Sequence, residues 1–308
     1  MQIGKSSLDV YPLCLGGNTF GWTATVEESR AVLNEYVDAG GNFIDTADVY
    51  SEWKEGNAGG ESEAIIGDWS KGRGNRADLV IATKVAKLSS AAGLSAANIK
   101  KAVDASLKRL NTDYIDLYYA HEEDHSVPVE ESIAAFDDLV QAGKIRYVGL
   151  SNFASDSIHK WMVLAPERSA PIALQPHYNL VFRAEFEDGL CPVAEQYDLG
   201  VMPYFSLAAG LLTGKYQADS PSGARAAAVT RHTSAQSERT VATLTKIAGD
   251  HNTEPAAIAI AWLLAQPTVA APIASARTVS QLPALLEGVT IALEKDELQR
   301  LDAVSAGL

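Results

Sequence analysis

The sequence has few cysteines and little positive charge, and each shortage excludes a class of protein. Only two of its 308 residues are cysteines, Cys14 and Cys191. Two are too few for a disulfide framework, so we expect reduced thiols. Lys and Arg number 25 against 39 Asp and Glu, which gives a net charge of −14. Such an acidic chain has no surface-wide field to attract nucleic acid or anionic lipid.

Long apolar runs are also missing. No stretch reaches the length of a membrane-spanning helix. The opening residues, MQIGKSSLDV, lack the basic segment and the apolar run of an export signal. These absences predict a cytoplasmic protein that acts on small molecules and has neither a nucleic acid nor a membrane as partner.

Short apolar runs alternate with longer amphipathic segments from Pro12 almost to the C-terminus, and no linker-like change of composition divides them. This alternation is typical of βα units around a parallel sheet. The count and the length together predict one (β/α)8 barrel, the TIM-barrel fold, as a single domain over residues 1–308. The expected strands are 13–16, 42–45, 79–84, 114–120, 145–150, 172–175, 201–204 and 269–273. The expected helices are 26–39, 61–70, 95–110, 128–142, 155–164, 190–197, 237–250 and 255–265, with two more near Thr278 and Lys295.

Two segments stand outside this repeat. Residues 1–3 and 8–10 are expected to form a hairpin that caps the lower end of the barrel, and a long loop rich in Gly, Ala and Ser is expected at about 205–236. A doubly wound fold is the alternative, and it needs a Gly-rich loop between its first strand and helix. The match Gly72-Arg73-Gly74-Asn75-Arg76-Ala77 instead follows a helix and precedes a strand, so we interpret it as a charged turn.

Polar residues stand where the expected strands end. In a (β/α)8 barrel these ends converge on one mouth. The residues are Asp45, Lys84, His121, Asn152, Gln175 and Tyr204, and Tyr50 follows Asp45 within the stretch NFIDTADVY.

A phenol with a pKa of about 10 is a poor proton donor near neutrality, and a neighbouring ammonium lowers that pKa. We therefore expect Lys84 to lower the pKa of Tyr50. Asp45 would pair with Lys84 and keep it charged, and His121 would hydrogen-bond a carbonyl oxygen. This arrangement protonates an oxygen on which negative charge develops, as when hydride reaches a carbonyl carbon.

Several segments resemble the aldo-keto reductase family, and the resemblance covers nearly the whole chain. In order, they are FIDTADVYS, GGESEAIIG, ATK, SLKRLNTDYIDLYYAH, GKIRYVGLSNF, LQPHYN and VMPYFSLAAGLLTGKY. The resemblance implies a catalytic tetrad, with Tyr50 as general acid, made of Asp45, Tyr50, Lys84 and His121. It also implies a nicotinamide cofactor, usually NADPH, bound in an extended form without a Rossmann domain.

The resemblance further implies where the cofactor binds. Ser151, Asn152 and Gln175 match the carboxamide-binding positions, and Tyr204 matches the aromatic residue that stacks on the nicotinamide ring. The pyrophosphate segment matches residues 206–211, with Ser206, Leu207, Gly210, Leu211 and the charged Lys215. Small residues there permit close approach of the backbone to a phosphate.

At the adenosine end, the segment ASARTVSQL matches the family's 2′-phosphate segment. It contributes Ser275, Arg277 as the phosphate ligand and Gln281 as its neighbour. The preference for NADPH over NADH rests mainly on Arg277. Many relatives continue with Glu-Asn where this chain has Ala284 and Leu285, so the adenine contacts are expected to differ.

The long loop adds Arg225 and Arg231, with Arg239 just beyond it, to an otherwise acidic chain. This basic cluster fits either a flap over the cofactor phosphates or a solvated loop, and the sequence leaves both open.

One motif competes with this interpretation. Residues 121–125, HEEDH, fit the zinc motif H-E-x-x-H, which requires a helix so that both histidines share one face. The segment follows a strand and meets Pro128 too soon for two helical turns, so we expect a loop and no metal. If this acidic loop lines the pocket, anionic substrates should be disfavoured. Trp22 and Trp53, in neighbouring loops, are expected to form an apolar wall or to pack within those loops.

The sequence thus predicts an NADP(H)-dependent reductase that transfers hydride reversibly between the cofactor and an aldehyde or ketone. The alternative is a cofactor-binding module that senses redox state with little turnover, like the channel-associated members of the family that the chain resembles. The substrate, the preferred direction and the oligomeric state do not follow from the sequence.

Overall fold

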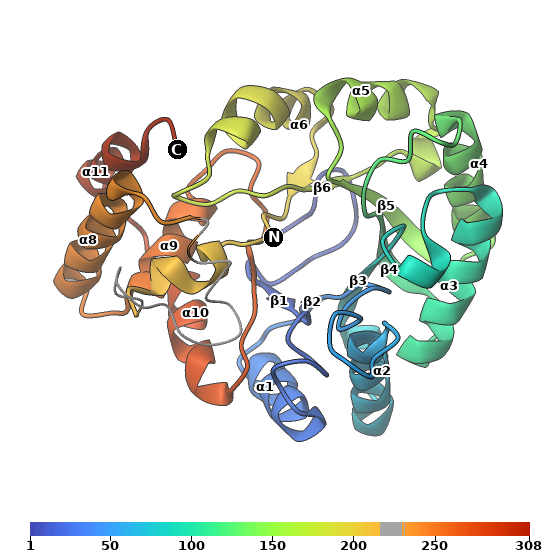
Figure 1. Cartoon of the computed structure of the whole chain (residues 1–308), viewed down its shortest axis with the longest axis horizontal. Coiled ribbons are helices and arrows are strands. Elements are labelled where there is room, and N and C mark those ends of the chain that lie inside the picture. The colour runs from blue at the N-terminus through green and yellow to red at the C-terminus, as the bar shows by residue number, and fades with distance from the viewer. Residues whose placement is uncertain (216–229, 231) are drawn as a thin grey trace.

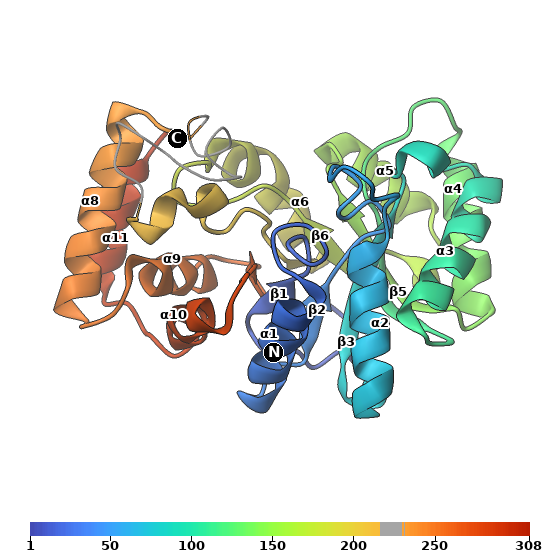
Figure 2. The same cartoon turned by 60° about the horizontal axis from the view of Figure 1, so that its bottom comes forward.

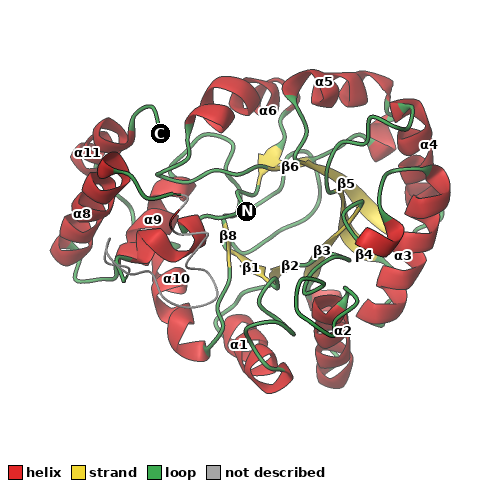
Figure 3. Ribbon diagram, viewed as in Figure 1, coloured by secondary structure: helices red, strands yellow, loops and turns green. Residues whose placement is uncertain are grey.

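The computed structural model describes residues 1–215, 230 and 232–308, and in this part of the chain eight parallel strands form one sheet in the order β7-β6-β5-β4-β3-β2-β1-β8. Helices surround the strands, as the ring of red ribbons in Figure 3 shows. This is the predicted (β/α)8 fold. The strands are β1 Cys14–Gly16, β2 Phe43–Asp45, β3 Val80–Val85, β4 Ile115–Ala120, β5 Ile145–Ser151, β6 Ala173–Gln175, β7 Gly200–Val201 and β8 Ile273–Ala274.

The last two strands are short and displaced from their predicted ranges. β7 ends at Val201 instead of residue 204, and β8 begins at Ile273 instead of residue 269. Pro203 and Pro272 explain this, because proline has no N–H to donate to a sheet. Backbone bonds between residues in and beside β7 and β8 close the barrel: Val201 N donates to Thr268 O, Ala270 N donates to Val201 O and Ile273 N donates to Pro203 O, each at 2.9 Å.

The helices lie outside the strands and begin close to the predicted positions. Thr25 caps the first and Ser95 caps the third through their side chains. In Figures 1 and 2, α8 and α11 lie side by side beyond the ring of helices. The helices are α1 Val26–Asp38, α2 Glu61–Arg73, α3 Ala96–Leu110, α4 Val129–Gln141, α5 Ser155–Leu164, α6 Cys191–Tyr197, α8 Ala235–Asp250, α9 Pro255–Leu264, α10 Leu282–Gly288 and α11 Lys295–Ser305.

The turn between α2 and β3 contains the glycine-rich match. Gly74 ends α2 with a φ of 71°, and a single 3₁₀ turn, Arg76–Asp78, leads into the strand. The segment connects a helix to a strand, so the prediction of a charged turn is confirmed.

The core has two parts. One lies between the sheet and the helices, and the other fills the inside of the barrel with residues such as Phe43, Leu117 and Met202. Ile3, Leu8 and Val10 join this inner cluster from the N-terminal segment, where Gln2 and Asp9 form an antiparallel bridge. The inner cluster thus closes the end of the barrel where the strands begin.

In residues 1–215, 230 and 232–308, no helix combines the length and the apolar character that crossing a membrane requires.

Candidate active site

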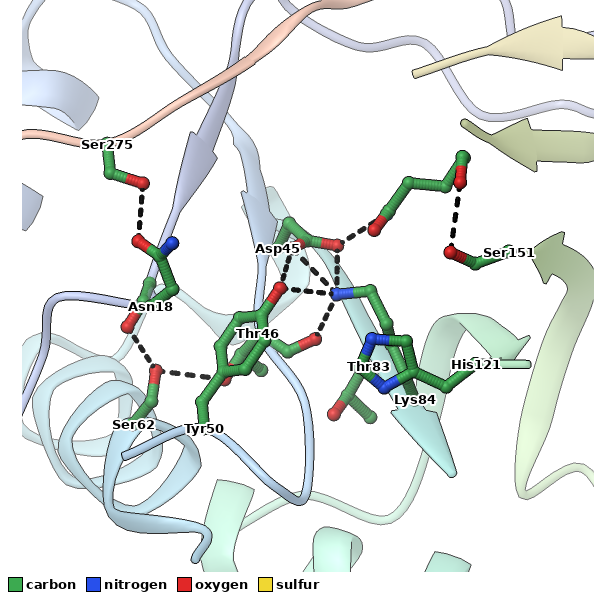
Figure 4. Close-up of polar contacts among 12 residues, drawn as sticks. Asn18, Asp45, Thr46, Tyr50, Ser62, Thr83, Lys84, His121, Ser151 and Ser275 are labelled. Carbon is green, nitrogen blue, oxygen red and sulfur yellow. Dashed lines mark hydrogen bonds and ion pairs between the residues drawn. The ribbon is translucent and has the colours of Figure 1, made fainter. Parts of the chain in front are cut away.

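Three of the predicted polar residues meet above the inner core. Asp45 is the last residue of β2, Lys84 lies in β3, and Tyr50 follows in the loop after β2. Lys84 Nζ donates to the Asp45 carboxylate at 2.7 Å and to Tyr50 Oη at 3.0 Å. Tyr50 Oη donates to Asp45 Oδ2 at 3.1 Å. Figure 4 shows the side chains of Tyr50 and Lys84 pointing toward Asp45.

Further bonds fix this group. Lys84 Nζ also donates to the backbone oxygen of Thr46 at 2.7 Å, and Gln175 Nε2 donates to Asp45 Oδ1 at 2.9 Å. Asp45 and Lys84 are buried, at 1% and 0% exposure. A buried ion pair needs such additional bonds to offset the cost of removing two charges from water. The ammonium is therefore held in one place, with the phenol as one of its acceptors.

The pKa of Tyr50 departs from the prediction. Burial, and then the Asp45 carboxylate, raise the pKa of Tyr50 well above its ordinary value. We predicted a lower pKa because the sequence places an ammonium nearby. The sequence does not reveal that burial removes the water that would solvate a phenolate, or that the phenol donates a hydrogen bond to a carboxylate. In the structure Tyr50 is a firmly protonated phenol.

The same burial acts on the two basic groups. Burial lowers the pKa of Lys84, and Asp45 opposes this shift. Burial, with the charges of Lys84 and Lys87, lowers the pKa of His121 well below its usual range. His121 is therefore a neutral imidazole near pH 7, and its ring centre lies 6.4 Å from that of Tyr50.

A chain of hydrogen bonds links the ends of β4, β5 and β6. Ser151 Oγ donates to Gln175 O at 2.9 Å, and Asn152 Nδ2 donates to Ser151 Oγ at 3.1 Å and to His121 O at 2.8 Å. Asn152 has a φ of 57°, which turns its side chain back toward its own strand end. Tyr204 Oη completes the chain by donating to Asn152 Oδ1 at 2.8 Å.

A pocket of about 560 Å³ brings most of the predicted residues together. Lys84 lies buried beneath it, and Leu211 packs into the outer core instead. Arg225 and Arg231 fall outside the described residues, and Arg239 lies exposed on α8. The predicted residues that line the pocket are Asp45, Tyr50, His121, Ser151, Asn152, Gln175, Tyr204, Ser206, Leu207, Gly210, Lys215, Ser275, Arg277 and Gln281.

The backbone before Leu211 is irregular. Ala208, Ala209 and Gly210 have φ angles of 48°, 57° and 112°, so three successive residues lie in the left-handed region. Non-glycine residues seldom occur there, and such strain concentrates at functional sites. Lys215, beyond this turn, pairs with Glu254 at 3.1 Å.

The adenosine end is more open. Arg277 is exposed, and its backbone N–H donates to Gln281 Oε1 at 2.7 Å. Ala284 and Leu285 line the same pocket, in the places where many relatives were expected to have Glu-Asn.

Sequence reasoning missed several lining residues. Asn18 accepts a hydrogen bond from Ser275 Oγ at 2.7 Å, and it follows β1 by two positions. The strand-end rule would have found it, since β1 ends at the same mouth. Lys87 and Phe205 also line the pocket, but they lie beyond strand ends, in loops whose paths the sequence does not specify.

The competing zinc motif lies in a loop, as predicted. Residues 122–128 contain no helix, and the His125 side chain is 86% exposed and lies 3.3 Å from Glu123. Of the described residues that line the pocket, none comes from 122–125. The condition under which we expected anionic substrates to be disfavoured is therefore not met.

The two tryptophans form a pair at the rim. Trp53 lines the pocket and makes edge contacts with Trp22, at 5.6 Å between ring centres, and with Tyr50, at 6.1 Å. The apolar wall thus comes from Trp53, and Trp22 supports it from behind.

Comparison with known proteins agrees with this geometry. The Aldo/keto reductase family pattern matches residues 12–306. The uncharacterized oxidoreductase YrpG of Bacillus subtilis (strain 168) is 36% identical, over 99% of this chain and 95% of that protein. Protein tas of Escherichia coli (strain K12) is 33% identical, over 98% and 96%. A protein of Oryza sativa subsp. japonica, named "Probable voltage-gated potassium channel subunit beta", is 32% identical, over 98% and 95%. The chain belongs to the aldo/keto reductase family.

Proposed function

We propose that the protein is an NADP(H)-dependent reductase of aldehydes or ketones, reversible, with Tyr50 as the general acid. Membership of the family supports an oxidoreductase. One observation carries the finer proposal: Tyr50 lines the pocket, and its hydroxyl lies 3.0 Å from Lys84 Nζ and 3.1 Å from Asp45 Oδ2. A phenol so placed can give a proton to a substrate oxygen and leave its negative charge beside an ammonium.

The raised pKa of Tyr50 suits this role. It keeps the phenol protonated over the neutral range, so the acid is present before substrate arrives. When the proton leaves for the carbonyl oxygen, the hydrogen bond from Lys84 Nζ stabilises the phenolate. Asp45 holds Lys84 in position, and neutral His121 can donate a hydrogen bond that orients the carbonyl.

The residues fit a nicotinamide cofactor. Ser151, Asn152 and Gln175 offer polar atoms on the side of the pocket opposite β1, and Tyr204 supplies an aromatic ring held by its bond to Asn152. The left-handed backbone at 208–210 suits a close approach to phosphate. The exposed guanidinium of Arg277 would hold a 2′-phosphate. When bound, the cofactor supplies the hydride.

Oxidation of NADPH with 4-nitrobenzaldehyde tests the proposal. We expect Tyr50→Phe to lower kcat by about 10²-fold or more, as the loss of a general acid does, with NADPH affinity kept within a fewfold. NADPH binding, followed by quenching of tryptophan fluorescence, shows whether the variant is folded. Equal kcat values for the two proteins would refute Tyr50 as the acid.

A second candidate has support from relatives that carry the name of a channel subunit, among them the Oryza sativa protein. In this alternative the protein binds the cofactor and reports its redox state with little turnover. Such a protein would bind NADPH tightly, yet its rate with a panel of aldehydes would not exceed that of Tyr50→Phe. The same experiment therefore separates the two functions.

A further inference from the structure

Lys87 is a charged residue of the pocket to which the proposed mechanism gives no role. It lies two positions beyond β3, and Ala86 before it has a φ of 124°, a value that residues with a side chain seldom adopt. Ala86 is buried, so the surrounding structure maintains this strain. The bend directs the chain so that Lys87 lines the pocket with His121 and Trp53.

Three other carboxylates of the loops after β2 and β4 bind other groups. Glu123 binds the backbone N–H of Ala154 and Ser157 Oγ, and Asp124 accepts from the backbone N–H of Leu94 at 2.7 Å. Glu52 accepts from the backbone N–H of Ser89 at 3.2 Å.

Glu122 is the carboxylate that faces Lys87. Lys87 Nζ lies 3.3 Å from Glu122 Oε2, and the Glu122 side chain is 47% exposed. Ion pairs this exposed contribute little to stability, so a ligand carboxylate can replace Glu122 at small cost. Lys87 also acts on the reaction site, because its charge helps to lower the pKa of His121.

Among the residues that the structure describes, Lys87 is therefore the accessible cation at the substrate end of the pocket, and Trp53 forms an aromatic wall there. Asp45 lines the pocket and forms an ion pair with the buried Lys84 at 2.7 Å, so the two charges neutralise each other, and Trp53 offers its ring at the rim. Lys215 and Arg277 line the portion that we assign to the cofactor phosphates.

We propose that Lys87 determines specificity by binding a carboxylate on the carbonyl substrate. The substrate class is then aldehydes or ketones with an apolar or aromatic body that contacts Trp53 and a carboxylate at the end away from the carbonyl. This inference rests on the proposed reductase function. It gives the acidic protein a local preference for anions that its net charge would not indicate.

Paired substrates test the assignment. We expect the wild type to reduce 4-carboxybenzaldehyde with a higher kcat/KM than its neutral ester, methyl 4-formylbenzoate. Lys87→Met should lower the ratio of the two kcat/KM values by about tenfold, mainly through the KM of the acid. Glu122→Gln should raise the ratio, because it removes the competing carboxylate. Increasing salt should lower the ratio in the wild type.

Lys100→Met is the matched control. Lys100 lies exposed on α3 and pairs with Asp138, so this variant removes the same charge away from the pocket. Its ratio should equal that of the wild type. A ratio that Lys87→Met leaves unchanged, or that Lys100→Met lowers equally, overturns the proposal.

A binding measurement separates this proposal from the proposed function. Calorimetric titration of the wild type with 4-(hydroxymethyl)benzoate, the alcohol product, should show binding that Lys87→Met weakens by about tenfold. If neither aldehyde is reduced and this binding depends on Lys87, the reductase function fails while the anion site stands. If binding is the same in both proteins, the anion site is wrong even where both aldehydes are reduced.

Discussion

Among single residues, the carboxyl group of Asp48 is unusual because it is buried beside charged neighbours and has no side-chain partner among the described residues. It is 1% exposed. Burial and the Glu63 carboxylate raise its pKa to about 7, against the opposing charge of Arg109. Arg109 itself is engaged by Glu63 at 2.6 Å. Asp48 is thus a neutral acid in the folded protein at mildly acidic pH.

This pKa predicts how stability depends on pH. Unfolded Asp48 ionises near pH 4, whereas folded Asp48 keeps its proton up to about 7. The unfolded state binds fewer protons in that window, so the free energy of unfolding falls as pH rises, by up to roughly 1.4 kcal/mol per unit. Asp48→Asn should make this fall shallower and should be more stable than the wild type at pH 8.

Urea unfolding from pH 4 to pH 8 measures the effect. Glu35→Gln, at an exposed position of α1, is the control and should keep the wild-type slope. If Asp48→Asn also keeps that slope, Asp48 is ionised in the folded state and the assignment is wrong.

The sequence predicted which residues line the candidate site, but it did not predict how burial and neighbouring groups change their pKa values. Asp45, Lys84 and His121 could be found because strand ends of a barrel meet at one mouth. The direction in which the pKa of Tyr50 shifts could not be predicted, because it depends on the removal of water from the phenol and on which group accepts the phenolic hydrogen bond. The sequence shows neighbours in the chain but not the water that folding removes.

At the scale of elements, the contact between α2 and α3 depends on one glycine. An added Cβ at Gly67 would lie 2.2 Å from the backbone oxygen of Arg109 and 2.6 Å from the Cα of Leu110. Both atoms belong to the last turn of α3, so neither can move without shifting a helix.

We therefore expect Gly67→Ala to lower the free energy of unfolding by about 1–3 kcal/mol despite the better helix propensity of alanine. Gly72→Ala is the control in the same helix, because a Cβ there meets nothing within 4 Å. It should be neutral or should stabilise the protein by up to about 1 kcal/mol. Equal effects of the two substitutions in denaturant unfolding would contradict the close contact.

The elements themselves were predictable where local pattern and packing agree. The cap at Ser95 and the span of α3 followed from residue type and spacing alone. The bounds of β8 could not be predicted in this way. Pro272 has no N–H to donate, so the strand begins after it, and the apolar run that begins at Val269 pairs with Val201 of β7 instead. A run of hydrophobic residues indicates that a segment is buried, but strand pairing also requires backbone N–H groups that face the neighbouring strand.

At the scale of the whole molecule, the inner core and the candidate active site lie at opposite ends of the barrel. Ile3 is fully buried in the inner core at the end where the strands begin, and the proposed tetrad lies at the end where they finish. Ile3→Ala should lower the free energy of unfolding by about 2–4 kcal/mol through the cavity that it leaves. Its kcat at 20 °C should match that of the wild type.

Val163→Ala is the control for that change, because Val163 is 65% exposed on α5 and should tolerate the loss. Thermal melts give the stability and NADPH oxidation gives the rate. If Ile3→Ala lowers kcat as well as the free energy of unfolding, the two ends of the barrel are coupled and the prediction is wrong.

The closure between β7 and β8 has a mechanical consequence. Most neighbouring strands share several ladder bonds, but here three backbone bonds, from the N–H groups of Val201, Ala270 and Ile273, join β7 and the residue Pro203 after it to β8 and the segment before it. The segment after β7 supplies Tyr204 and Leu207, and the segment after β8 supplies Ser275 and Arg277. A cofactor bound as proposed would touch both segments, so the ligand that would serve the reaction would also hold β7 and β8 together.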